Sequence, residues 1–302
     1  MGSFRQILAA TDFSEDARQA AFRAAILAHE HGAGLELLHV VTESSVRTLE
    51  SFAGMPTDIS ARLTGEAGAA LAALATDISR RYGIEPTIRT AMGDPADTIA
   101  AMAENADLLA MGPRGAGGLR DLFLGAVTDR VLRRSSGPVL VVKRPPDEPY
   151  ARVLVPVAFG PHSAGALQTA LLLAPDAETT VFHAFIVPYE ASLSLAGLRD
   201  DQVRAYRETA RAAAMAGVEE LLTGLGVGGV RVRRSVEGGE SVPLILAKAA
   251  ELESDLVVIG RRGRGPVEEF FLGSVTRHIL SGSPADVLIV GARPDRRPAS
   301  TA

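Results

Sequence analysis

The sequence predicts an α/β protein made of two tandem, doubly wound domains, each built on a parallel five-stranded sheet. Three observations support this prediction: apolar runs alternate with amphipathic segments, several of the runs are aliphatic throughout, and the whole pattern occurs twice. Alternating strands and helices favour parallel strands joined by right-handed crossovers. Strands that are aliphatic at nearly every position are typical of a sheet covered on both faces.

In the first half, five apolar runs are predicted to be strands. They occupy residues 4–11, 35–41, 86–92, 106–112 and 138–142. Between them, apolar residues recur at helical spacing, which predicts helices over 14–31, 58–83, 94–105 and 124–135. Ser14, followed by Glu15 and Asp16, suits the start of the first helix, because a hydroxyl caps the free amides and acids favour the positive end of the dipole.

The second half repeats the first at a nearly constant offset. "ILAATDFSEDA" corresponds to "VLVPVAFGPHS", and "VLVV" corresponds to "VLIV". A period of about half the chain is too long for a solenoid and indicates a duplicated domain. We therefore predict domains over 1–144 and 151–293, a proline-rich linker over 145–150, and a disordered tail over 294–302.

Composition limits the classes of function. The chain has 302 residues, of which 47% are hydrophobic and 5% aromatic, so alanine-rich helices should pack on aliphatic strands. The 31 basic residues are mixed with 36 acidic ones, which disfavours nucleic acid as a partner. There is no cysteine, which excludes disulfides and thiolate metal sites. No apolar run reaches the roughly 18 residues that span a bilayer, and no signal peptide is recognised, so we expect a cytoplasmic protein without a membrane partner.

A set of three glycines follows the fourth strand of each half. Gly112, Gly115 and Gly125 correspond at one offset to Gly260, Gly263 and Gly273. Glycine lets backbone amides approach a ligand closely, and free N–H groups at a helix start attract anions. A phosphate chain is therefore the expected ligand, although the glycines could instead serve only a tight turn between strand and helix.

The spacing Gly-2x-Gly-9x-Gly-Ser, between "DLVVIG" and "VLIV", resembles the universal stress protein family. The similarity covers nearly the whole chain as two family domains. The resemblance implies a Rossmann-like sheet in the order 3-2-1-4-5, and ATP or ADP, with or without Mg²⁺, as the ligand. The residues it implies are Asp12 on the ribose or adenine side, Val40 and Val41 beside the adenine (Ala184 and Phe185 in the second half), and Gly112, Gly115, Gly125, Gly260, Gly263, Gly273 and Ser274 at the phosphates.

The two halves depart from the family pattern in opposite ways. The first half keeps Asp12 but has Ala126 where the hydroxyl is expected, whereas the second half keeps Ser274 but has Ala158 in place of the aspartate. A lost hydrogen bond to a phosphate costs about 1.5–3 kcal/mol. We therefore rank the second half as the better phosphate site and the first as the better nucleoside site, and expect Ser274→Ala to weaken binding more than Asp12→Ala. Both sites could also be vestigial.

The predicted function is adenine-nucleotide binding by a regulatory or sensor protein in stress adaptation, with no catalytic residues and no metal site. One alternative is a regulatory or assembly protein of the same fold that binds no nucleotide, and another is a slow ATPase. The strands "PVLVVK" and "DVLIVG" are expected to pair the two halves, and a homodimer is a further option.

Several other polar residues need interpretation. His39 and His183 end the second strand of each half, and we interpret them as hydrogen-bonded packing residues rather than catalytic ones. Arg261 is interpreted either as a screen for phosphate charge or as a solvated loop residue. Asp107 and Asp255 are expected to cap or solvate the start of the fourth strand. Asp94 is not expected to be catalytic, since Val242 takes its place in the second half.

Overall fold

The computed structural model describes residues 4–44, 46–48, 59–115, 124–187, 199–227, 232–261 and 272–291. They fall into two compact units. The first runs from the N-terminus to Pro149 and includes Arg261 and the strand Asp286–Val290, whereas the second comprises Tyr150–Gly260 and Gly273–Ala285. Gly263 and the tail 294–302 lie outside the described residues, and the boundaries 1–144 and 151–293 remain predictions.

The first unit contains six described strands and four helices of nine or more residues, and its first five strands alternate with these helices as expected. Its strands are β1 (Gln6–Ala10), β2 (Gly34–Val41), β3 (Thr87–Met92), β4 (Leu108–Met111), β5 (Val139–Val141) and β10 (Asp286–Val290). Its helices are α1 (Glu15–His31), α3 (Ile59–Tyr82), α4 (Pro95–Ala103) and α5 (Ala126–Arg134). These bounds agree with the predicted segments of the first half to within a few residues at each end.

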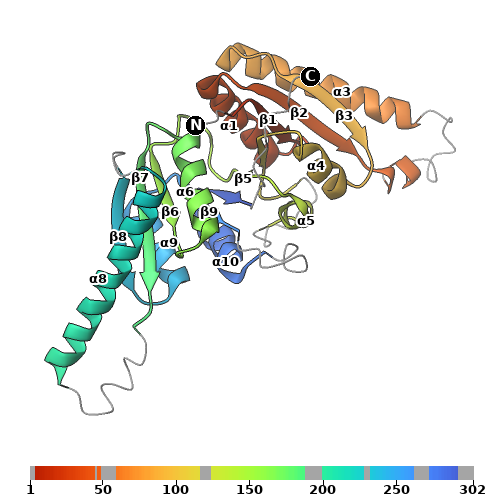
Figure 1. Ribbon diagram of the computed structural model, residues 1–302. Coiled ribbons are helices and arrows are strands. Elements are labelled where there is room, and N and C mark those ends of the chain that lie inside the picture. Colours follow the sequence, from red (N-terminus) through yellow and green to blue (C-terminus); the bar gives the residue numbers. More distant parts are fainter. Residues whose placement is uncertain are drawn as a thin grey trace, which may run out of the picture. The chain divides into compact units, whose positions relative to one another are not determined.

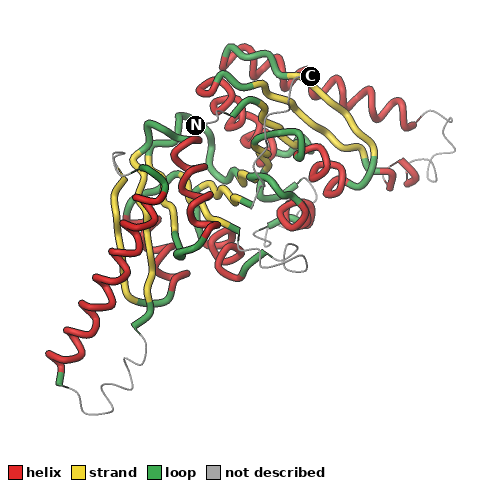
Figure 2. The backbone as a smooth tube through the Cα atoms, viewed as in Figure 1, coloured by secondary structure: helices red, strands yellow, loops and turns green. Residues whose placement is uncertain are grey.

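The second unit repeats this alternation through its first four strands. Its strands are β6 (Arg152–Pro156), β7 (Glu178–Phe185), β8 (Val232–Gly238) and β9 (Leu256–Gly260). Its helices are α6 (Pro161–Leu173), α8 (Asp200–Gly224), α9 (Ser241–Glu251) and α10 (Ser274–Gly282). Figure 2 shows α8 running along the strands of this unit, with its first turns reaching past the strand ends.

Local sequence explains why α1 begins and ends where it does. The Ser14 hydroxyl accepts a hydrogen bond from the Ala17 amide at 3.3 Å, as expected of an N-cap. The helix stops at Gly32, whose φ of 60° lies in the left-handed region that glycine adopts at little cost. Ser14 therefore acts as the predicted N-cap of α1.

The strand order of the first unit is β3-β2-β1-β4-β5-β10, so its first five strands have the predicted order 3-2-1-4-5. These five are parallel, as the pairs β1–β2, β1–β4, β2–β3 and β4–β5 show. β10 pairs with β5 in the antiparallel sense, with Leu288 opposite Leu140. This confirms the predicted pairing of these two strands.

The four strands of the second unit lie in the order β9-β6-β7-β8 and are all parallel. This order corresponds to 4-1-2-3 within the second half and is the same arrangement as in the first. In the first unit, α1 packs with α3 and α4 packs with α5, and Figure 1 shows these pairs on opposite faces of the sheet. Both units are therefore doubly wound.

Two duplicated aspartates secure the start of the first strand in each half. The Asp107 carboxylate accepts hydrogen bonds from the amides of Arg5 and Gln6, at 2.9 and 3.1 Å. Asp255 accepts from the amides of Ala151 and Arg152 in the same way. The prediction of a capping role was right, but the amides that these carboxylates satisfy belong to the neighbouring strand.

A buried ion pair joins β10 to the rest of the first unit. The Asp286 side chain is fully buried, and its carboxylate lies 3.5 Å from the guanidinium of Arg23 on α1. The same carboxylate accepts hydrogen bonds from the amides of Lys143 and Arg144, at 2.7 and 3.0 Å. A buried charge needs such partners because its desolvation is costly. Asp286 therefore ties β10 to both α1 and the segment that follows β5.

Lys143 is expected to make the stability of the first unit depend on pH. Burial lowers the pKa of its ammonium group from 10.5 to about 8, although Asp286 acts in the opposite direction. A lowered pKa means that the unfolded chain holds the proton more tightly, so stability rises as the pH increases from 8 to 10.5.

We predict that the Lys143→Met variant lacks this rise. The difference in free energy of unfolding between wild type and variant should shift in favour of the wild type between pH 8 and pH 10.5. The shift should be at most about 3.5 kcal/mol, since one pKa unit corresponds to about 1.4 kcal/mol. Urea unfolding of both proteins across this range measures it, and parallel pH profiles would contradict the assignment.

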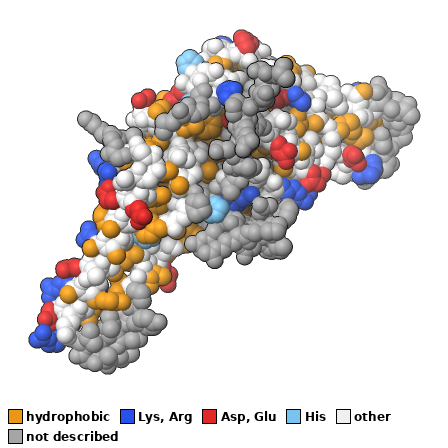
Figure 3. Space-filling model, in the orientation of Figure 1, with side chains coloured by type: hydrophobic (Ala, Val, Ile, Leu, Met, Phe, Trp, Pro, Cys, Tyr) orange, Lys and Arg blue, Asp and Glu red, His pale blue; other side chains and the backbone are white. Residues whose placement is uncertain are grey.

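The described surface carries a mixture of charged and apolar side chains. On the face shown in Figure 3, acidic and basic side chains are interspersed among apolar ones over the described residues. Among the helices that the structure describes, none is both long and apolar enough to cross a membrane.

Candidate functional site

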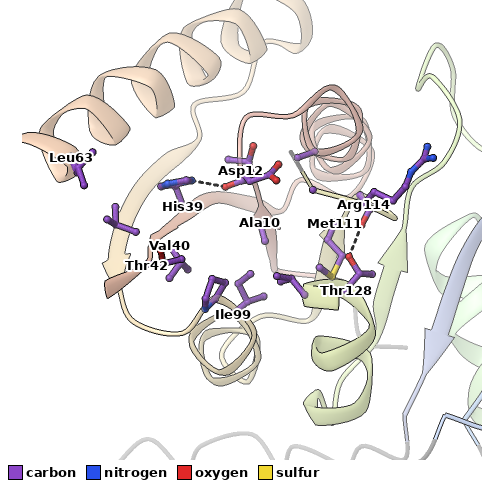
Figure 4. A pocket seen from close by; sticks show the side chains of 17 residues that line it. Ala10, Asp12, His39, Val40, Thr42, Leu63, Ile99, Met111, Arg114 and Thr128 are labelled. Carbon is purple, nitrogen blue, oxygen red and sulfur yellow. Dashed lines mark hydrogen bonds between the residues drawn. The ribbon is translucent and has the colours of Figure 1, made fainter. Parts of the chain in front are cut away.

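A cavity of about 650 Å³ lies at the carboxyl ends of β1, β2 and β4 in the first unit (Figure 4). β1 lies between β2 and β4, so the chain leaves the sheet in opposite directions on the two sides of this point. Such a switch point leaves a crevice that open α/β sheets commonly use for ligands. Leu63 of α3, Ile99 of α4 and Val127 of α5 supply apolar side chains to the lining.

The end of β2 presents backbone polar groups to this cavity. The Leu38 carbonyl accepts from the Thr11 amide at 2.8 Å, and the Val41 carbonyl accepts from the Gly93 amide at 3.1 Å. Successive residues of a parallel strand face alternate neighbours, so Val40 shares the β1-facing side with Leu38. β1 ends at Ala10, which leaves the N–H and C=O of Val40 directed into the cavity. Val40 and Val41 were predicted to have the same role beside the adenine. Their backbone groups differ, since those of Val40 face the cavity and the carbonyl of Val41 is bonded to Gly93.

Asp12 lies beside the glycine loop of the same half. Its Oδ1 accepts hydrogen bonds from the amide and the hydroxyl of Ser14, at 3.1 and 2.5 Å. Its Oδ2 is so close to Gly115 that a Cβ there would lie 2.5 Å away. The structure therefore brings together Asp12, Gly112 and Gly115, which the sequence predicted to share one site.

The glycines of the motif have separate structural roles. A Cβ on Gly112 would lie 2.8 Å from the backbone carbon of Asp16, so this glycine lets β4 end against the first turn of α1. Gly125 is the N-cap residue of α5 and supplies no side-chain capping hydrogen bond. The first amides of α5 lack an intrahelical acceptor and form the electropositive end of its dipole.

Thr128 was missed by the sequence analysis. Its hydroxyl is buried and donates a 3.0 Å hydrogen bond to the Gly112 carbonyl, linking the first turn of α5 to the end of β4 (Figure 4). Thr276, also buried, occupies the matching position in the second half. The recurrence of threonine at the offset of the glycines was the signal that could have identified it.

Ion pairs surround the cavity. The Arg114 guanidinium lies 3.2 Å from the Asp16 carboxylate. Asp94 caps α4 through the Asp97 amide and forms a paired hydrogen bond with Arg130 of α5. The Arg130 guanidinium lowers the pKa of the Asp94 carboxyl below its usual value. Asp94 is therefore a capping and pairing residue.

His39 lines the cavity at the end of β2. Its Nδ1 lies 2.8 Å from the Thr11 carbonyl oxygen, and its ring stacks on Phe13 with centroids 4.6 Å apart. In the second half, His183 contacts the Val157 carbonyl at 2.8 Å, and its ring lies against Phe159 in a more tilted arrangement. The interpretation of both residues as hydrogen-bonded packing histidines is confirmed.

The second half repeats part of this geometry. A Cβ on Gly260 would lie 2.3 Å from the His162 carbonyl oxygen, which matches the role of Gly112. Gly273 is the N-cap residue of α10 and Ser274 is the first residue of that helix. Where the first half has Asp12, Ala158 has both its amide and its carbonyl hydrogen-bonded to the Ser163 hydroxyl. The predicted ranking of the two halves as phosphate sites stays a prediction.

The interpretation of Arg261 as a solvated loop residue was wrong, whereas its screening of phosphate charge stays a prediction. Its Nη1 donates to the Leu132 carbonyl at 2.6 Å, and its amide donates to the Val290 carbonyl at 2.8 Å. Helix ends leave carbonyls without intrahelical donors, and arginine can satisfy them. Arg261 therefore caps the last turn of α5 within the first unit.

The fold is that of a doubly wound α/β protein with a cavity at its sheet switch point. The model of the universal stress protein family matches residues 3–143 and 149–291, and the chain belongs to this family as two tandem domains.

Individual relatives agree with this assignment. Universal stress protein MJ0531 of Methanocaldococcus jannaschii is 32% identical over 151 residues, which cover 48% of this chain and 85% of that protein. Universal stress protein Rv2005c of Mycobacterium tuberculosis is 28% identical over 201 residues, covering 65% of each chain. A universal stress protein structure from Archaeoglobus fulgidus aligns with a TM-score of 0.73 at 23% identity, over 95% of this chain and 98% of that one, and shows the same fold.

Proposed function

We propose that the first unit binds an adenine nucleotide, ATP or ADP, in the cavity at the ends of β1, β2 and β4. The protein then acts as a nucleotide-responsive regulator in stress adaptation. The observation that carries the proposal is the pairing of two features across one cavity: an open backbone N–H and C=O at Val40 and the start of α5. Adenine offers a donor and an acceptor on one edge, which suits such a backbone pair, and phosphates favour a helix N-terminus.

Asp12 lies where it can accept hydrogen bonds from ribose hydroxyls. It is the one carboxylate among the described residues that line the cavity, and its Oδ1 already accepts two hydrogen bonds from Ser14. Any Mg²⁺ would be held mainly by the nucleotide's own phosphates, because the described residues contain no cluster of three metal-ligating side chains.

Calorimetry on the full chain tests this proposal. ATP-Mg and ADP should bind, and Asp12→Asn should weaken that binding by roughly tenfold or more, since a hydrogen bond to a charged group contributes about 1.5–3 kcal/mol. Asparagine can still accept the Ser14 hydrogen bonds, so the turn should persist. Asp176→Asn, an exposed position in the second unit, is the control. The absence of both binding heat and a thermal shift at millimolar ATP-Mg would overturn the proposal.

A further inference from the structure

We propose that His39 is a positioning residue for the ligand: by bonding the Thr11 carbonyl, it keeps the Val40 N–H open to the cavity. The inference rests on the proposed function, because it names the residue that maintains the base-binding edge of β2. His39 then has a role beyond packing.

The register of β1 and β2 shows what His39 displaces. The two strands pair up to Ala10 opposite Leu38, and the Thr11 amide continues the ladder by donating to the Leu38 carbonyl. The next bond of a parallel ladder would run from the Val40 N–H to the Thr11 carbonyl. In the structure that carbonyl is bonded to His39 Nδ1 at 2.8 Å, and the backbone hydrogen bonds of the described residues include none from Val40 to it. The ladder stops one bond early, and the Val40 N–H keeps its orientation toward the cavity.

The contact also defines the state of the imidazole. A carbonyl oxygen only accepts hydrogen bonds, so Nδ1 must carry the proton. The Phe13 ring, 4.6 Å away and nearly parallel, holds the imidazole in this orientation. The titratable and charged neighbours that line the cavity are Asp12 and Arg114. The bond to Thr11 needs only an Nδ1 proton, which the neutral and the charged imidazole both provide.

The second half contains the same arrangement of histidine and carbonyl. The Val157 amide donates to the Phe182 carbonyl, and the Val157 carbonyl is bonded to His183 Nδ1 at 2.8 Å. This arrangement leaves the Ala184 N–H in the position of Val40. The loops that follow differ, since Asp12 is replaced by Ala158. The histidine contact and the early end of the ladder therefore occur together in both halves, and neither requires an aspartate in the loop.

Three substitutions distinguish a positioning role of His39 from a packing role. His39→Ala releases the Thr11 carbonyl, and the Val40 N–H should then extend the ladder, so nucleotide affinity should fall roughly three- to tenfold. In His39→Asn, the side-chain N–H lies near the position of Nδ1 and should restore the affinity. In His39→Gln, the amide is displaced by one methylene and should not restore it. His31→Ala is the control, because it removes a histidine–phenylalanine contact, to Phe4, away from the cavity.

Site-resolved hydrogen exchange of the ligand-free full chain provides a readout that needs no nucleotide. The Val40 amide should exchange faster than the Leu38 amide in the wild type and should become protected in His39→Ala. This result would support the inference even if no nucleotide bound, in which case only the proposed function fails. Equal Val40 exchange in wild type and His39→Ala would overturn the inference, as would equal nucleotide affinities for the Asn and Gln variants.

Discussion

Replacing Asp286 with alanine is expected to lower the free energy of unfolding by about 3–5 kcal/mol, the usual cost of removing one partner of a buried ion pair. Asp286 is fully buried and Arg23 is 4% exposed, so water cannot replace the lost carboxylate. The amides of Lys143 and Arg144 would also lose their acceptor. Denaturant unfolding of the full chain measures the change.

A double variant distinguishes charge from packing. Replacing both members, as in Arg23→Met with Asp286→Leu, should recover much of the loss, since an apolar pair needs no solvation. Asp147→Ala, an exposed acid near the same segment, should change stability by less than about 0.5 kcal/mol. A loss below 1 kcal/mol for Asp286→Ala, roughly the value of a surface pair, would show that the carboxylate is solvated in solution.

Gly260→Ala is expected to destabilise the protein by about 3 kcal/mol in the absence of any nucleotide. The added Cβ would lie 2.3 Å from the His162 carbonyl oxygen, and a backbone atom cannot move aside without shifting α6. Overpacking of this kind costs about 1–3 kcal/mol and occasionally more. Thermal and denaturant unfolding without ligand measure the effect.

Gly165→Ala on α6 is the matched control, because nothing lies within 4 Å of its Cβ position. This variant should be neutral or more stable by up to about 1 kcal/mol, the helix preference of alanine over glycine. The comparison also tests what the first motif glycine does. A Gly260→Ala protein of normal stability but weakened nucleotide binding would mean that this glycine serves the ligand and not the contact with α6.

Much of the fold could be predicted because its signals are local. Aliphatic runs and amphipathic spacing located the strands and helices of the first half, and the order of its five parallel strands agrees with the family resemblance. The link between Arg23 and Asp286 could not be predicted, because the partners lie near opposite ends of the chain and neither stands in a motif. Arg261 was misread for a similar reason: its partner, Leu132, is brought close only by tertiary structure.

The candidate site was predicted in outline. Asp12 and the glycines Gly112 and Gly115 were expected at one strand edge, and the structure places them there. The difference between Val40 and Val41 depends on the residue at which β1 ends and on which neighbour each amide faces. Composition and spacing carry no information on that register, so the distinction between Val40 and Val41 and the role proposed for His39 rest on the hydrogen bonds.

The place of β10 has a consequence for biosynthesis. β5 obtains its second neighbour from residues 286–290, which the ribosome adds only after the whole second unit has been made. Until then the nascent first unit presents β5 as an open aliphatic edge, a feature that invites pairing with other chains. The first unit is therefore complete only once β10 has been synthesised. Translation products truncated before Asp286 would keep β5 as an unpaired edge strand that is prone to aggregation.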